Sequence, residues 1–230
     1  MKILFEDEDL IVCIKPVGVL SQGGGEASLE TALREHTGGE IFPVHRLDAG
    51  VGGVMVYAKT KSAAAKLSAQ VAERRFEKEY LALLCGRPES ESGRLEDLLF
   101  KDSSKNKVFV VKRERRGVKK AVCEYRSLWS GRLKNEEYTL VLVKLKTGRT
   151  HQIRVQFASR KLPLSGDKKY GARDGEKQIG LFSCKLSFDS PRTGESTSFS
   201  SLETESELLK SAIEKAEIST DEHGLSAEPK

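Results

Sequence analysis

Two segments of this 230-residue chain place glycine and polar side chains together where a strand is expected to begin or end. In the first segment, residues 43–53, Asp48 is followed by Gly50, Gly52 and Gly53, and a short apolar strand is expected next. Because glycine permits backbone conformations closed to other residues, such a turn can present the carboxylate of Asp48 in a cleft. The other interpretation is an Asx-turn, in which the carboxylate only accepts hydrogen bonds from the amides that follow it.

The second segment, residues 146–154, joins an expected strand to an expected helix and carries Arg149, His151 and Arg154. Basic side chains grouped around the free amides at a helix start can bind an anion or a carboxylate. The alternative is a helix cap whose arginines face solvent. The spacing alone leaves both interpretations open.

Basic residues are concentrated in one part of the chain. Residues 101–120 contain nine Lys and Arg against two acids, whereas the last 30 residues carry a net charge of −5 and residues 1–200 a net charge of +10. A basic surface of this kind is typical of proteins that bind polyanions, because each phosphate that it neutralises releases counterions. A solvated hairpin rich in lysine would show the same charge pattern.

Helices and short strands are expected to position these segments. Ser28 is expected to cap a helix over residues 29–36, and Thr60 to begin an alanine-rich helix that runs to about Arg75. Alternating or continuous apolar runs predict strands over residues 3–5, 10–14, 54–58, 76–85, 108–111, 121–129, 138–145, 181–189 and 195–201, with a flexible loop at residues 23–25 and a polar loop at residues 89–106.

Residues 150–160 fit both a strand period and a helix period, and the capping residue Thr150 favours a helix. Because strands outnumber helices, the sequence predicts one α+β domain around a largely antiparallel or mixed sheet. We expect this domain to occupy residues 1–201. Residues 202–230 are expected to form an acidic helix to about Ile218 and then a disordered tail.

Several motifs, in a fixed order along the chain, resemble those of the RluA-type family of RNA pseudouridine synthases. The resemblance covers roughly residues 3–200. It implies a long bent mixed or antiparallel sheet, flanked by helices and loops, with a central active-site cleft. The matching motifs are Lys15-Pro16-x-Gly18, His45-Arg46-Leu47-Asp48, Lys78-Glu79-Tyr80-Leu81-Ala82-Leu83, Lys120-Ala121 with Tyr125, Thr147-Gly148-Arg149-Thr150-His151-Gln152-Ile153-Arg154, and Gly166-Asp167 with Tyr170-Gly171.

The resemblance implies that the chain isomerises specific uridines of tRNA or rRNA to pseudouridine. That reaction breaks the bond between N1 and C1′, turns the uracil, joins C5 to C1′ and removes the C5 proton. No oxidation or reduction occurs, so no cofactor is implied, in agreement with a sequence that has neither a dinucleotide fingerprint nor a metal-spaced His/Cys cluster. The implied partner is structured RNA, with no membrane and no metal, and the absence of a coiled-coil seam favours a monomer.

By the same resemblance, Asp48 would act at the ribose of a flipped-out uridine. Arg149 would pair with Asp48, and the ring of Tyr80 would stack on the uracil. Ile153 would form an apolar wall of the base pocket, and Arg46 would fill the vacated stack or hold the backbone. Without the resemblance, Tyr80 and Ile153 would be taken for core residues and Arg46 for part of a surface ion pair.

The resemblance also suggests that Arg154 and Lys120 contact RNA. The chain departs from the family pattern where Val51-Gly52-Gly53 stands in place of Thr-Ser-Gly, and Lys161-Leu162-Pro163 and Leu181-Phe182-Ser183 each lack an expected histidine. Two missing hydroxyls predict that the loop around Asp48 is looser or differently braced. The alternative function is therefore an RNA-binding protein or RNA chaperone with weakened catalysis.

Several other classes of protein are excluded. No stretch approaches the roughly 20 apolar residues of a membrane span, and the acidic start of the chain does not fit a signal peptide. Four cysteines without a CxxC pair fit neither a zinc knuckle nor a disulfide-rich secreted scaffold. A cytoplasmic protein is expected. Because the family match begins almost at Met1, no S4-type RNA-binding module is expected before it.

Overall fold

The computed structural model describes residues 1–23, 28–221 and 224–227, and it divides the chain into two compact units. Unit 1 comprises Met1–Lys78, Phe182–Glu205 and Ser219–Ser226, and unit 2 comprises Glu79–Leu181, Ser206–Ile218 and Ala227–Lys230. The expected flexible loop at residues 23–25 lies mostly outside the described residues. Within the described residues, no helix has the length and apolarity of a membrane span.

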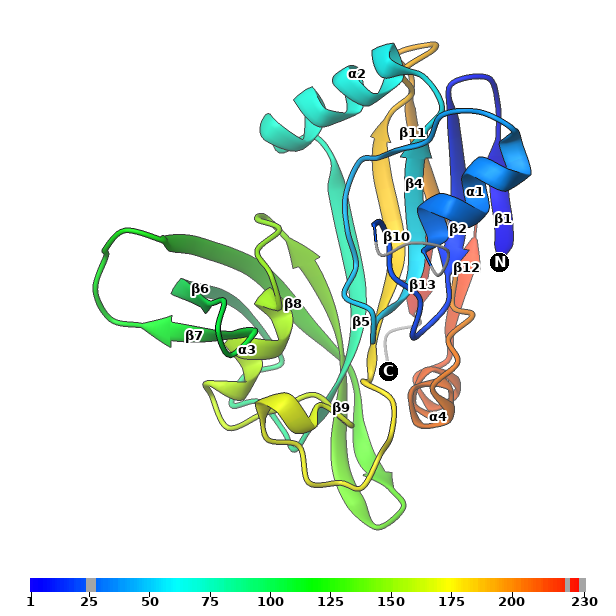
Figure 1. The fold of residues 1–230 in the computed structure, drawn as a ribbon. Helices are drawn as coiled ribbons and strands as arrows, with labels where there is room; N and C mark the ends of the chain where they lie inside the picture. The colour runs from blue at the N-terminus through cyan, green and yellow to red at the C-terminus, as the bar shows by residue number, and fades with distance from the viewer. Residues whose placement is uncertain (24–27, 222–223, 228–230) are drawn as a thin grey trace. The chain divides into compact units, whose positions relative to one another are not determined.

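Unit 1 contains a mixed sheet with the strand order β1-β2-β4-β10, in which β11 pairs with β10 and β3 pairs with β4 (Figure 1). Antiparallel pairing joins β2 to β4, whereas β10 runs parallel to β4 at Phe182 and Ser183. Every residue of β2 and of β4 is buried. The elements of this unit are β1 (Lys2–Glu6), β2 (Leu10–Lys15), α1 (Leu29–Thr37), β3 (Phe42–Pro43), β4 (Gly52–Ala58), α2 (Lys61–Ala72), β10 (Leu181–Asp189) and β11 (Ser196–Ser200).

Unit 2 is built on strands in the order β5-β9-β8-β6-β7, so β7 is the edge strand of this unit's sheet. Antiparallel pairing joins β6 to β7 and β8, and β8 to β9. Helix α3 packs against these strands through Val155, which belongs to an apolar cluster with Leu99, Val108 and Ala121. The elements are β5 (Glu77–Cys85), β6 (Ser92–Asp102), β7 (Lys107–Val111), β8 (Val118–Leu133), β9 (Glu136–Leu145), α3 (Gln152–Ala158), the 3-10 helix η2 (Lys168–Tyr170) and α4 (Glu207–Lys215).

The α+β class and the mixed sheet that the sequence predicted are confirmed. The helix caps predicted at Ser28 and Thr60 are present, since the hydroxyl of Ser28 accepts a hydrogen bond from Thr31 N and that of Thr60 from Ala63 N. Hydroxyl caps of this kind satisfy amides that have no partner inside the helix.

Two predicted segments differ from the structure. Residues 89–106 were expected to be a polar loop, but β6 runs through them and buries Leu95 and Leu99 on one face while pairing with β8. The C-terminal helix, α4, is shorter than the sequence predicted. The segment expected to be a disordered tail contains β12 (Ile218–Asp221) and β13 (Gly224–Ala227), which pair with each other. β-branched residues at the start of β12 favour such extended backbone.

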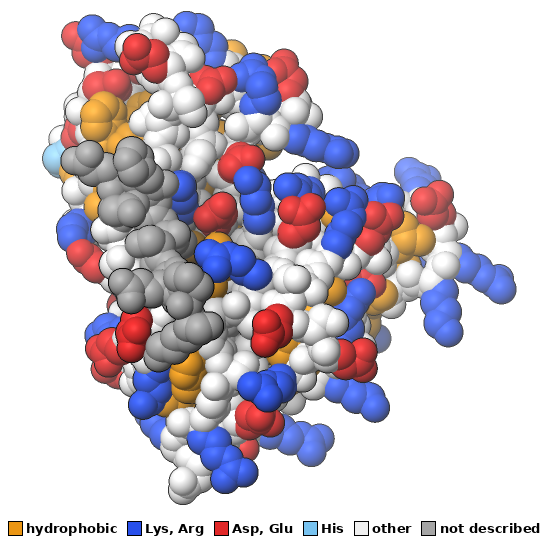
Figure 2. Space-filling model, turned by 180° about the vertical axis from the view of Figure 1, so that it is seen from behind, with side chains coloured by type: hydrophobic (Ala, Val, Ile, Leu, Met, Phe, Trp, Pro, Cys, Tyr) orange, Lys and Arg blue, Asp and Glu red, His pale blue; other side chains and the backbone are white. Residues whose placement is uncertain are grey.

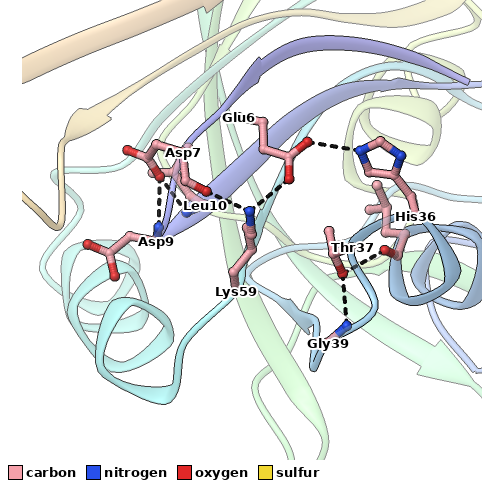
Figure 3. Close-up of polar contacts among 9 residues, drawn as sticks. Glu6, Asp7, Asp9, Leu10, His36, Thr37, Gly39 and Lys59 are labelled. Carbon is pink, nitrogen blue, oxygen red and sulfur yellow. Dashed lines mark hydrogen bonds and ion pairs between the residues drawn. The ribbon is translucent and has the colours of Figure 1, made fainter.

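A cluster of charges ties the β1–β2 turn of unit 1 to α1 and α2 (Figure 3). Glu6 accepts from Lys59 Nζ at 2.7 Å through Oε1 and contacts His36 Nε2 at 2.9 Å through Oε2. Lys59 Nζ also donates to the backbone oxygen of Asp7 at 2.6 Å. The hydrogen bond from Lys59, and then that with His36, lowers the pKa of Glu6 below its usual 4.5.

This lowered pKa predicts a pH-dependent contribution of Glu6 to stability. A carboxyl whose pKa is lower in the folded than in the unfolded chain stabilises the fold above about pH 4.5, and that stabilisation is lost as the pH falls through the folded pKa. We expect Glu6→Gln to cost less than about 1 kcal/mol at neutral pH, because the pair is partly solvated, and less still near pH 3. Urea unfolding of both proteins at the two pH values measures this, and an equal difference at both would contradict it.

Candidate active site

Asp48 lies half-buried on the turn of unit 1 that precedes β4. Its backbone oxygen accepts from Val51 N at 3.0 Å, which closes the turn. The preceding residue is fixed by Ser21, whose hydroxyl accepts from Leu47 N at 3.0 Å and donates to Leu47 O at 2.9 Å. The backbone on both sides of Asp48 is therefore held by specific hydrogen bonds.

Lys15 ties the residue after Asp48 to a second turn. The ammonium group is buried and donates to the backbone oxygens of Pro16 and Val19, both at 2.7 Å, and of Ala49 at 3.2 Å. Gly18 N donates to the same oxygen of Ala49 at 2.8 Å. Burial lowers the pKa of Lys15 from 10.5 to about 8, although nearby carboxylates, including that of Asp48, act in the opposite direction.

Gly53 is required at its position because of close backbone packing. Its φ is +129°, and a Cβ atom there would lie 2.4 Å from the backbone oxygen of Ser183 on β10. Together with the bonds from Lys15 and Ser21, this packing braces the loop in which Val51 and Gly52 replace two expected hydroxyls. The loop is thus held by these contacts, without hydroxyls at positions 51 and 52.

We expect Lys15→Met to lower the free energy of unfolding by about 2–4 kcal/mol, since it removes the ammonium donor from the carbonyl groups of Pro16 and Val19 and one of the two donors from that of Ala49. Chemical denaturation measures this loss. The control is Lys61→Met, whose ammonium group is mostly exposed and whose removal should change stability by no more than about 0.5 kcal/mol. Equal effects of the two variants would show that the buried ammonium does not brace the loop.

The two residues before Leu47 have different environments. His45 is buried beside Phe76 and accepts a hydrogen bond from Val56 N through Nε2. Burial, assisted by the nearby charge of Lys78, lowers the pKa of His45 to about 3, so the ring is neutral near pH 7 and serves the core. The side chain of Arg46 is exposed, which is compatible with its predicted contact with the nucleic acid backbone.

In unit 2, Tyr80 and Ile153 are both buried, at 6% and 4% exposure. Tyr80 lies on β5 and Ile153 in the first turn of α3. Their predicted roles, stacking on uracil and forming an apolar wall, stay predictions, because core residues would show the same burial.

Arg149 is exposed at the turn before α3, where its Nε donates to the backbone oxygen of Lys120 at 3.0 Å. The side-chain oxygen of Gln152 accepts from Arg149 N at 3.0 Å and from the Thr147 hydroxyl at 2.8 Å. The amide of the same Gln152 donates to Val122 O on β8 at 3.1 Å. Gln152 therefore organises the turn that carries Arg149, a role that the sequence interpretation missed.

The predicted cap at Thr150 is wrong. The N-cap residue of α3 is His151, which has a left-handed backbone with φ of 50° and makes no side-chain cap hydrogen bond. The turn before the helix is closed instead by Arg149 O, which accepts from Gln152 N at 3.1 Å. The signal available in the sequence was Gln152, a polar residue beside the apolar Ile153, because a buried amide side chain needs hydrogen-bond partners.

Arg154 does not present its charge to solvent. Its guanidinium forms two hydrogen bonds with the carboxylate of Asp167, Nε to Oδ2 at 2.6 Å and Nη2 to Oδ1 at 2.9 Å, and both side chains are buried. The prediction that Arg154 contacts RNA is therefore not supported by its placement. Lys120 is exposed and its ammonium forms an ion pair with Glu96.

Within unit 2 the structure thus brings together two of the predicted site residues, Arg149 and Lys120. The predicted pairing of Asp48 with Arg149, and the approach of Tyr80 to the same substrate, join residues of different units and stay predictions.

The basic hairpin, residues 101–120, runs from the end of β6 through β7 to the start of β8. In Figure 2, Lys and Arg side chains project from the edge of the molecule that carries β6 and β7. The guanidinium of Arg115 lies 4.4 Å from the ring centroid of Phe100, and the ammonium of Lys107 lies 5.9 Å from that of Phe109, whose ring is partly exposed. Cations beside aromatic rings, the exposed Arg115 and the partly exposed Lys107, suit the binding of nucleic acid.

Searching the described ranges reveals no group of three or more His, Cys, Asp and Glu side chains that could hold a metal ion. The four cysteines are free thiols, and burial raises the pKa of Cys13, Cys85 and Cys123 to about 12. At this pKa a thiol is not a nucleophile near neutral pH.

Comparison with known proteins identifies the family. A family model described as RNA pseudouridylate synthase matches residues 9–159, more than half of the chain. The chain is 37% identical over 206 residues to ribosomal large subunit pseudouridine synthase D of Borreliella burgdorferi. That alignment covers 81% of this chain and 60% of the Borreliella protein. It is 29% identical over 228 residues to tRNA pseudouridine synthase C of Haemophilus ducreyi, covering 88% of this chain and 90% of that protein.

A solved structure with a similar fold is that of human RNA pseudouridylate synthase domain containing 1, with a TM-score of 0.74, 25% identity, and coverage of 88% of this chain and 83% of the human one. The chain spans about 60% of the length of the Borreliella relative and of several others. From the extent of the family match and the order of its motifs, the chain belongs to the RNA pseudouridylate synthase family, and within it to the RluA type.

Proposed function

We propose that this chain converts specific uridines of rRNA or tRNA to pseudouridine. The observation that carries the proposal is the braced turn of Asp48, in a chain that belongs to a family named for this reaction. Relatives are named as synthases for ribosomal large subunit RNA and for tRNA, which supports RNA of either kind as the substrate. We further propose that the chain acts in the cytoplasm as a monomer.

In the proposed reaction, Asp48 acts at the ribose of a uridine extruded from the RNA stack. The bond between N1 and C1′ breaks, the uracil turns, and C5 forms a new bond to C1′. The proton on C5 then leaves and N1, which carries no hydrogen in uridine, takes up a proton, so the product has the same atoms as the substrate. A fixed backbone around Asp48 supports this role, because a carboxylate held in one geometry loses little entropy on reaching the reacting carbon.

We assign supporting roles to residues of both units. The charge of Arg149 orients the carboxylate of Asp48, and Tyr80 places its ring on the uracil with its hydroxyl near C5. Ile153 forms an apolar wall beside the base. Arg46, Lys120 and the basic hairpin hold the RNA backbone, because their charges are exposed.

The alternative, an RNA-binding protein with weakened catalysis, rested on the missing hydroxyls of the Asp48 loop and on the two missing histidines. Since Lys15 and Ser21 brace that loop, the missing hydroxyls do not favour the alternative.

The test uses tRNA and rRNA transcripts that carry tritium at C5 of uridine. Purified protein, with nothing else added, should release tritium to water and produce pseudouridine at a few defined positions. Salt-dependent RNA binding without tritium release would instead support the alternative. Mapping of pseudouridine in total RNA from cells with and without the gene then identifies the RNA and the nucleotide.

A further inference from the structure

Tyr170 connects two parts of unit 2 that the proposed function assigns to RNA binding and to catalysis. It ends η2, and its hydroxyl lies between β7 of the basic hairpin and His151 at the start of α3. The oxygen accepts from Val108 N at 2.9 Å and lies 2.8 Å from His151 Nδ1. One hydroxyl therefore contacts both elements.

The contact with Val108 satisfies an amide on the outer edge of the sheet. β7 pairs with β6 on one side and is the edge strand of unit 2, so its outward amides need partners other than a strand. Val108 is buried, and an amide that lost its partner there would carry a desolvation cost. The ring of Tyr170 also packs against the apolar cluster that contains Val108 and Val155.

Two cations lie against the same ring. The guanidinium of Arg154 is 5.1 Å from the ring centroid of Tyr170, and the ammonium of Lys107, a member of the basic hairpin, is 5.4 Å from it. Arg154 is itself fixed by its buried pair with Asp167. The ring thus contacts both a fixed guanidinium and a member of the basic hairpin.

His151 links this contact to Arg149, two residues earlier in the chain. His151 has a left-handed backbone with φ of 50°, which is uncommon outside glycine, and its ring meets that of Tyr170 edge to face with centroids 5.6 Å apart. Arg149 in turn bonds to the backbone of Lys120, where the hairpin joins β8. The hairpin and the turn of Arg149 are therefore joined at two places.

We propose that Tyr170 and His151 are positioning residues that hold the basic hairpin in one place beside Arg149, so that bound RNA meets this arginine in a single register. The inference rests on the proposed function, since it assigns RNA to the hairpin. It predicts that the hydroxyl of Tyr170 matters more for RNA engagement than for stability.

The test compares Tyr170→Phe with the wild-type chain. The variant keeps the ring and its contacts with both cations but loses the hydroxyl. We expect exchange of the Val108 amide with deuterium to be about tenfold faster or more, KM for an RNA transcript to rise about 3–10-fold, and kcat to stay within about twofold. The slope of log affinity against log salt concentration should become shallower by about the amount that one phosphate contact contributes, because a loose hairpin neutralises fewer phosphates.

The matched control is Tyr138→Phe, which removes another hydroxyl of unit 2, one that donates to Asp174 at 3.3 Å away from the hairpin. It should leave KM and the salt dependence unchanged even if it lowers Tm as much as Tyr170→Phe does. His151→Gly, which tolerates the left-handed backbone and has no side chain to contact Tyr170, should reproduce the effect of Tyr170→Phe, and the double variant should be no worse than either single one.

A fall in Tm without any change in Val108 exchange, KM or salt dependence would overturn the inference, and so would additive effects of the two variants. If Tyr170→Phe fails to fold, His151→Gly decides by the same measurements. Failure of the proposed reaction has a different result: the wild-type chain would bind RNA without releasing tritium, while Val108 exchange and the salt dependence would still respond to Tyr170→Phe.

Discussion

Asp48→Asn is expected to lower the rate of tritium release from C5-labelled RNA by at least about a thousandfold. The amide has nearly the shape of the carboxylate but no negative charge, so it can neither add to the ribose nor stabilise positive charge there. RNA affinity should stay within about twofold, because the basic hairpin and Arg46 are unchanged. The two measurements are the release of tritium in single turnover and the binding of the same RNA by fluorescence anisotropy.

The control for this substitution is Glu40→Gln, which removes one mostly exposed carboxylate and the same charge. It should alter neither quantity by more than about twofold. The intact mass of the asparagine variant must be checked, since deamidation would restore the aspartate. An undeamidated variant that retained more than about a tenth of the wild-type rate would remove Asp48 from the reaction.

The structure agrees with the sequence interpretation where the determinants are local. The caps at Ser28 and Thr60 need only a hydroxyl and an amide a few residues later, and both are observed. The glycine-rich turn before β4 was also predicted, because positive φ at Gly53 depends on that residue itself.

The interpretation fails where the partner is distant in the chain. The sequence interpretation gave Lys15 no role beyond its place in a motif, and one of its acceptors, Ala49 O, lies 34 positions away. β6 carries charged residues that hide its period, and its pairing with β7 and β8 makes it a strand. Side-chain partners across such separations are set by the tertiary fold, which propensity and periodicity do not contain.

Arg154 is the clearest case, since its motif predicted an RNA contact and its placement indicates a structural role. We expect Arg154→Met to lower the free energy of unfolding by about 3–5 kcal/mol, because it leaves the carboxylate of Asp167, 1% exposed, buried without its partner. The double variant with Asp167→Leu should recover much of this loss, since no unpaired charge then remains. Urea unfolding measures both.

Arg46→Met provides the contrasting control, because Arg46 is exposed and is proposed to hold the RNA backbone. It should change stability by no more than about 0.5 kcal/mol but weaken RNA binding and its salt dependence, as the loss of one phosphate contact requires. The Arg154→Met variant should show the opposite pattern. Its free energy of unfolding falls, but RNA binding by the protein that remains folded keeps the wild-type salt dependence. If Arg154→Met instead weakened that dependence at unchanged stability, the buried pair with Asp167 would not be the main role of Arg154, and the contact predicted from the motif would be restored.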